Sequence, residues 1–105
     1  MIIADFAAKS RKLCGFKLSG HAGYANAGND IVCAAVTSAV QLTVNNLTEI
    51  FNIDATVTVL ENVIECKVSS TNNQTAVKLL EGLKLHLEIL SEDYMGTIKV
   101  NVLEV

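Results

Sequence analysis

The chain has 105 residues, half of them hydrophobic, and a formal net charge of −3 at pH 7. This length predicts a single domain over residues 1–105. The few basic residues are scattered, which argues against direct nucleic-acid binding, because that needs clustered Lys and Arg. The hydrophobic content is high for so small a domain, so we expect a homodimer that covers part of the apolar surface, with a well-filled monomer as the alternative.

The three cysteines, Cys14, Cys33 and Cys66, form neither a C-x-x-C pair nor a zinc-binding pattern. We therefore expect no metal, no cofactor and reduced thiols, which are typical of a cytoplasmic protein. Asp5 interrupts the apolar start of the chain, so no signal peptide is predicted. No stretch is predicted to span a membrane.

The first half of the chain predicts a hairpin, a loop and a helix. Residues 1–8 and 13–18 indicate two strands joined by the polar turn 9–12. Residues 20–30 hold three glycines, two asparagines and an aspartate, a composition typical of a loop, and a loop this long in a small domain favours a functional role. Asp30 is predicted to cap a helix that runs to Phe51.

The second half alternates again between strand and helix patterns. Residues 56–61 and 63–69 predict a hairpin around Asn62, residues 72–90 a helix, and residues 97–105 a final strand. The second helix has an apolar stripe at steps of three and four: Ala76, Leu80, Leu83, Leu87 and Leu90. The order ββαββαβ predicts an α+β two-layer sandwich, with two helices packed on one face of a mostly antiparallel sheet.

Cys33 is the candidate nucleophile. It is expected in the first turn after the Asp30 cap, where the helix dipole would stabilise a thiolate and lower the thiol pKa. His21 lies at the other end of the loop, which is long enough to bring its imidazole to the thiol as a general base. Unpaired N–H groups of the same helix start could bind a tetrahedral oxyanion. These features together describe a site for acyl transfer.

Other interpretations of these residues remain open at this point. A cysteine at a helix start is often a small buried hydrophobe. A Gly-rich loop before a helix can bind phosphate, although Asp30 and the absence of a nearby lysine disfavour an anion. A metal or redox site formed by His21, Cys33 and Cys14 is a further possibility, and the irregular spacing of these residues disfavours it.

The sequence also resembles a known family. Gly20-His21-Ala22, then Gly28, then the run D-I-V-C-A-A-V over residues 30–36, resemble the signature of the ribosomal-processing cysteine proteases called Prp, and the length and element order agree over the whole chain. The resemblance implies a homodimeric protease with Cys33 as nucleophile and His21 as base. It implies removal of the N-terminal extension of a bacterial large-subunit ribosomal protein, the L-twenty-seven protein, by cleavage after aromatic residues. A non-enzymatic ribosome-assembly module that binds through the same groove is the alternative.

Two further residues near Cys33 match or depart from the family pattern. Asp30 matches the family's aspartate, and we favour a helix cap over a role in orienting His21. Thr37 stands where the family usually carries serine. Because positions i and i+4 share a helix face, its hydroxyl is expected one turn beyond the thiol, with a bond back to the Cys33 carbonyl as the simpler interpretation.

The loop itself supplies candidate substrate contacts. Gly20 is expected to allow a sharp turn beside His21, and Gly23 and Gly28 are expected to make the loop a mobile lid. Tyr24 could contact substrate. Outside this region, Cys14 and Cys66 are interpreted as structural thiols, and His86 as an exposed residue off the apolar stripe of its helix.

Overall fold

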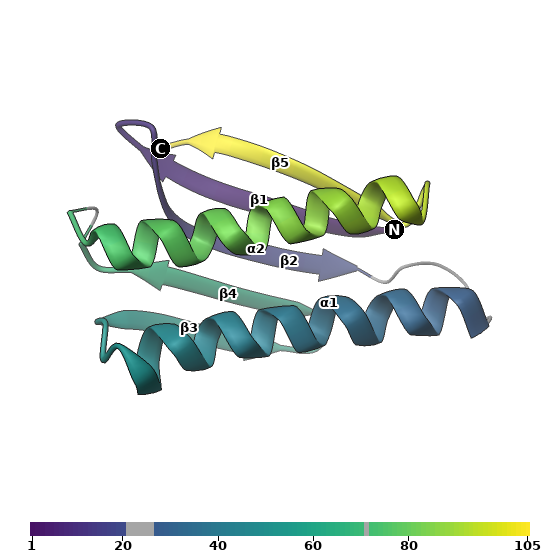
Figure 1. Ribbon diagram of the computed structural model, residues 1–105, viewed down its shortest axis with the longest axis horizontal. Helices are drawn as coiled ribbons and strands as arrows, with labels where there is room; N and C mark the ends of the chain where they lie inside the picture. Colours follow the sequence, from purple (N-terminus) through teal and green to yellow (C-terminus); the bar gives the residue numbers. More distant parts are fainter. Residues whose placement is uncertain (21–26, 71) are drawn as a thin grey trace.

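The computed structural model describes residues 1–20, 27–70 and 72–105, with side chains described from residue 31 onward in the second of these ranges. Two helices cover one face of a five-stranded sheet (Figure 1), which confirms the predicted α+β sandwich. In chain order the elements are β1 (Ile2–Lys9), β2 (Lys12–Gly20), α1 (Ala27–Asn45), the π-helical turn η1 (Asn46–Ile50), β3 (Ala55–Leu60), β4 (Val63–Val68), α2 (Gln74–Asp93) and β5 (Ile98–Glu104).

The strands lie in the order β3-β4-β2-β1-β5, and only the β1–β5 pair is parallel. β1 and β2 form the predicted hairpin. Its turn residues Ser10 and Arg11 have φ angles of 52° and 66°, both positive as a type I′ turn requires. The register places Ile2 opposite Gly20, so the end of β2 lies beside the start of the chain.

The core lies between the sheet and the helices. Along β1 every second side chain is buried, as expected for a strand with one covered face. The predicted stripe of α2 is confirmed, with Leu90 half-buried and its other members buried. In α1 the buried side chains recur every four residues, at Val32, Val36 and Val40. The two helices therefore pack onto the sheet through apolar rows that the sequence spacing predicts.

The start of α1 differs from the prediction. The helix begins at Ala27, so Gly28 is its second residue and Asp30 its fourth. The prediction that Asp30 is the N-cap was therefore wrong, as was the placement of Gly28 in a loop. Asn caps a helix as well as Asp does, and asparagines stand on both sides of Gly28, so the preference for capping residues does not single out Asp30. A glycine lowers helix propensity but does not by itself end a helix.

The end of this helix also differs. Residues 46–50 form a π turn, in which the N–H of Phe51 donates to the carbonyl of Asn46 at 2.9 Å. The wider turn breaks the four-residue spacing after Leu47, which is fully buried. Phe51, to which the helix was predicted to run, is consequently exposed and lies just after this turn.

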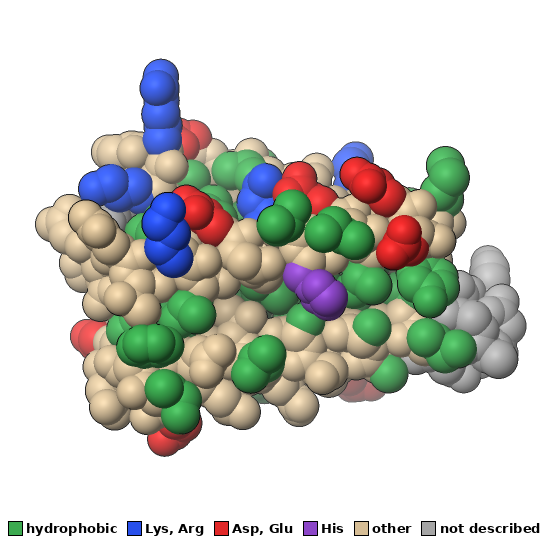
Figure 2. Space-filling model, in the orientation of Figure 1, with side chains coloured by type: hydrophobic (Ala, Val, Ile, Leu, Met, Phe, Trp, Pro, Cys, Tyr) green, Lys and Arg blue, Asp and Glu red, His purple; other side chains and the backbone are tan. Residues whose placement is uncertain are grey.

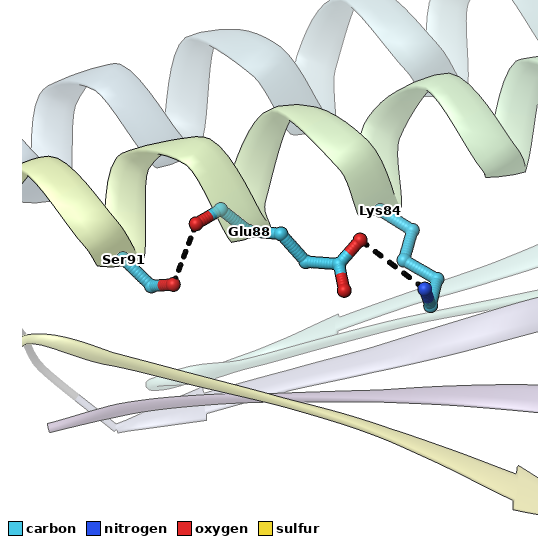
Figure 3. A network of polar contacts seen from close by, with 3 residues as sticks. All are labelled: Lys84, Glu88 and Ser91. Carbon is cyan, nitrogen blue, oxygen red and sulfur yellow. Dashed lines mark hydrogen bonds and ion pairs between the residues drawn. The ribbon is translucent and has the colours of Figure 1, made fainter.

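Polar contacts hold the two ends and the side of α2. The side chain of Asn73 caps the helix by accepting a hydrogen bond from the N–H of Ala76 at 3.0 Å. In the second half of the helix Lys84 pairs with Glu88 at 3.2 Å, and the hydroxyl of Ser91 donates to the Glu88 carbonyl at 2.7 Å (Figure 3). An i, i+4 pair of this kind at a helix surface stabilises a helix by about 0.3–0.5 kcal/mol.

One sequence expectation about membranes needs correction. The segment Ile31–Ile50 has 20 residues and a mean hydropathy of 1.3, so by length and composition it is long and apolar enough to cross a membrane. Polar but uncharged residues such as Gln41 interrupt it without lowering its hydropathy below that of a spanning segment. In the fold 28% of this window is buried, and its apolar row belongs to the core cluster.

Candidate active site

Cys33 lies half-buried on α1, at the wall of a cavity between this helix and the β2-β4-β3 side of the sheet. The cavity has a volume of about 490 Å³, within the range of pockets that bind small ligands. Apart from Cys33, most of its lining is apolar and comes from both layers, including Leu18, Val36, Val40, Val57 and Ile64. A thiol here faces a space that can hold apolar side chains of a bound molecule.

Gly20, the last residue of β2, also lines this cavity. Its φ angle is +83°, and a Cβ built on it would lie 2.5 Å from the carbonyl oxygen of Met1. Both facts restrict this position to glycine. Its N–H donates to the carbonyl of Asn62 at 3.2 Å, which ties the end of β2 to the β3–β4 turn. The positive φ of Gly20 fits the predicted sharp turn beside His21, but the residues that would complete the turn lie outside the described ones, so the turn stays a prediction.

The next residues along the chain, including His21, Gly23 and Tyr24, lie outside the described residues. β2 ends at Gly20, on the wall of the cavity that holds Cys33. The predicted role of His21 as general base, of Gly23 as a hinge and of Tyr24 as a substrate contact stay predictions.

Cys33 is the seventh residue of α1, in the second turn, rather than in the first turn as predicted. At 1.5 Å per residue, it lies about 9 Å along the helix axis from the first residue. The effect of the helix dipole is confined to the first turn. The N–H groups that an N-terminus leaves unpaired are those of its first four residues, and the last of these is about 4.5 Å from Cys33 along the helix axis. The expected oxyanion donors at this helix start stay a prediction. Activation of the thiol by a neighbouring base, for which the sequence offers His21, stays a prediction.

Thr37 lines the same cavity one turn beyond Cys33, and its side chain is exposed. It is part of a series that the sequence reasoning missed. Cys33, Thr37, Gln41 and Asn45 are four residues apart, and all of them line the cavity. We call these four residues the polar row. Its signal was present in the sequence, as polar side chains at i, i+4 and i+8 within an otherwise apolar helix.

The Asp30 side chain lies outside the described part of α1. The helix begins before Asp30, so Asp30 is not its N-cap. The remaining candidate role for Asp30 is to orient His21. That role stays a prediction.

The other thiols have different surroundings. Cys66 is fully buried in the core, and burial raises the pKa of its thiol to about 11, so it stays protonated at neutral pH. Cys14 is half-buried and its Sγ lies 3.5 Å from the carbonyl oxygen of Ala7; it does not line the cavity. Over residues 1–20, 27–70 and 72–105, no three His, Cys, Asp or Glu side chains gather as metal ligands would. His86 is exposed, as predicted.

A half-buried thiol beside an apolar cavity, in a two-layer domain of this size, is the arrangement of a small cysteine protease. The family comparison is specific: the chain belongs to the cysteine protease Prp family, whose model matches residues 1–99. The resemblance inferred from the G-H-A and D-I-V-C-A-A-V motifs is thereby confirmed.

Individual relatives agree with this assignment. The chain is 29% identical over 91 residues to the ribosomal processing cysteine protease Prp of Bacillus subtilis, with 81% of each chain covered. Among solved structures, the Prp of Staphylococcus aureus with a covalently linked product peptide has a TM-score of 0.89 and 24% identity, covering 98% of this chain and all of that one. A Streptococcus mutans protein has a TM-score of 0.88 and 22% identity, covering 100% and 99%. These structures show the shared fold.

Proposed function

We propose that this protease removes the N-terminal extension of a bacterial large-subunit ribosomal protein, the L-twenty-seven protein, by cleaving after aromatic residues. The observation that carries the proposal is the position of Cys33 at the wall of a largely apolar cavity of about 490 Å³. A cavity of this kind suits aromatic side chains, because they bury a large apolar surface when they bind. The ribosomal processing activity named for the Bacillus subtilis relative supports the choice of substrate.

The proposed chemistry uses two side chains. His21 takes the proton of the Cys33 thiol, and the thiolate attacks the carbonyl carbon of the scissile bond. The tetrahedral intermediate collapses when the C–N bond breaks and the imidazolium gives its proton to the leaving amine. A water molecule, deprotonated by His21, then attacks the thioester, which releases the acyl fragment and restores the thiol.

We further propose that the enzyme is a cytoplasmic homodimer. The chemistry requires a reduced thiol, and a ribosomal substrate is met in the cytoplasm. Hydrophobic side chains gather over both helices on the face shown in Figure 2. Among the exposed apolar residues of these helices are Ile31, Leu42, Leu85 and Ile89, with 46–63% of their surface exposed. A second copy would cover such side chains. Leu42→Glu is expected to convert the dimer to a monomer in analytical ultracentrifugation.

The test of the activity is mass spectrometry of a peptide that spans the proposed cleavage junction. We expect the wild-type enzyme to cut it after the aromatic residues, and Cys33→Ala and His21→Ala each to leave it intact. Binding of an uncut peptide by the wild-type protein would support the ribosome-assembly module in place of the protease.

A further inference from the structure

The strand β3 lies at one edge of the sheet, and within the described residues it pairs with β4 alone. Its register with β4 is regular, and its sequence A-T-V-T-V-L holds no charge and no proline. The opposite edge strand, β5, carries Lys99, Asn101 and Glu104. Proteins commonly protect edge strands with charges, prolines or bulges, because an open edge pairs with other chains. The edge of β3 lacks all three.

The hydrogen bonds of the hairpin fix which residues face this open edge. The N–H of Ser69 donates to the carbonyl of Asp54 at 3.0 Å, and these two residues are opposite each other when the β3–β4 register is extended by one pair. In an antiparallel ladder hydrogen-bonded pairs alternate with unbonded pairs. Thr56, Thr58 and Leu60 therefore bond to β4. The backbone groups of Ala55, Val57 and Val59 point away from it, toward the open edge.

The same edge borders the cavity that holds Cys33. Val57 and Val59 line the cavity, and Val59 is 70% exposed although it lies on the helix side of the sheet. Across the cavity lies the polar row, with Gln41 and Asn45 exposed. The result is a groove with the open edge of β3 as one wall, the polar row as the other, and an apolar floor.

The groove is long enough for several extended residues. From Cys33 to Asn45 the helix rises about 18 Å at 1.5 Å per residue. An extended chain covers that length in about five residues.

We propose that substrate residues on the acyl side of the scissile bond bind in this groove as a sixth strand, paired with the edge of β3. The inference rests on the proposed protease function, because the occupant of the groove must place its scissile carbonyl at Cys33. Main-chain hydrogen bonds to Val57 and Val59 supply affinity, and alternate side chains enter the apolar floor, as in other cases of strand addition.

The direction of the added strand follows from the topology together with the acyl-side placement proposed above. β2 and β3 each pair antiparallel with β4, so they run the same way (Figure 1). The registers place Ser19, Val63 and Leu60 in line across the sheet. Gly20 and Leu60 are thus at the same end, and both line the cavity of Cys33. Residues that precede the scissile bond extend from this end toward Ala55. The added strand therefore runs parallel to β3.

The first test uses the wild-type enzyme and a junction peptide with a single backbone N-methyl group at each of the residues before the scissile bond in turn. We expect kcat/KM to fall about tenfold or more at every second position, where the N–H faces β3, since a hydrogen bond is lost and the methyl group meets the edge. At the intervening positions the N–H faces flexible side chains of the polar row, so kcat/KM should fall by no more than about threefold. A flat profile, or sensitivity only after the scissile bond, overturns the proposal.

The second test changes the edge itself. Val59→Pro removes an N–H that faces the open edge and no bond to β4, whereas Val59→Ala removes side-chain bulk and keeps the N–H. We expect KM for the junction peptide to rise about tenfold more in Val59→Pro than in Val59→Ala, with kcat little changed. Equal KM values for the two variants would overturn the strand pairing but not the proposed protease function. A wild-type enzyme that does not cut the peptide would overturn the proposed function. Loss of a dimer in Val59→Pro alone would assign the edge to a second copy and overturn the inference.

Should Val59→Pro fail to fold, the N-methyl profile on the wild-type enzyme decides alone.

Discussion

Replacing Gly20 by alanine tests how the fold positions the residue before His21. Gly20 and Gly96 have nearly the same φ angles, +83° and +81°, but a Cβ on Gly20 would lie 2.5 Å from the Met1 carbonyl oxygen, while a Cβ on Gly96 would have no described atom within 4 Å. Gly96→Ala therefore isolates the cost of the left-handed backbone, about 1–2 kcal/mol. Gly20→Ala adds the displacement of the start of β1, about 1–3 kcal/mol more.

The comparison is made by thermal unfolding and by cleavage of the junction peptide. At about 4–8 °C per kcal/mol, the Tm of Gly20→Ala should be at least about 4 °C below that of Gly96→Ala. Its kcat/KM should fall about tenfold or more even at temperatures where the variant is folded, since a misplacement of about 1 Å near the reacting groups costs up to about a hundredfold. Equal Tm and equal kcat/KM for the two variants would refute the reasoning about this end of β2.

Further predictions concern stability, thiol chemistry and the site. Gly82→Ala should stabilise the protein by about 0.8–1 kcal/mol in urea unfolding, since it lies within α2 with open space around it; a loss of stability would contradict this. Because burial raises the pKa of Cys66 from 9.0 to about 11, only the unfolded chain loses this proton between these values. The wild-type Tm should therefore fall from pH 9 to pH 11, and less so in Cys66→Ala; equal slopes would contradict it. Asp30→Asn should lower kcat/KM and change the acid limb of its pH profile, with at most about 1 kcal/mol lost in stability; a change in Tm alone would assign Asp30 to the helix. Thr37→Val should lower kcat about tenfold, and Thr37→Ser should restore it to within about threefold; equal rates in both would remove the hydroxyl from the reaction.

The fold follows the sequence pattern wherever side-chain spacing alone decides the structure. The leucine steps of α2 and the alternation in β1 could be predicted because one face of each element is covered by the other layer. The two ends of α1 could not be predicted in this way. Caps are chemically interchangeable, so Asp30 gave no unique start, and the π turn before Phe51 depends on tertiary packing that no local pattern encodes.

The site divides in a similar way. Cys33 and Gly20 could be found from their motif and from the special backbone that glycine permits, and both lie at one cavity. The cavity and the open edge beside Val59 could not be predicted, because they depend on how α1 and the strands pack together, which no local pattern encodes. The expected dipole at Cys33 was wrong because it depended on a helix start that the sequence placed three residues too late.

Intact-protein mass spectrometry during turnover of the junction peptide tests the central claim most directly. If Cys33 is the nucleophile, the wild-type enzyme should gain the mass of the acyl fragment minus water, located on Cys33 by peptide mapping, and Cys33→Ala should show neither the adduct nor cleavage. Cleavage at the wild-type rate by Cys33→Ala would contradict the account.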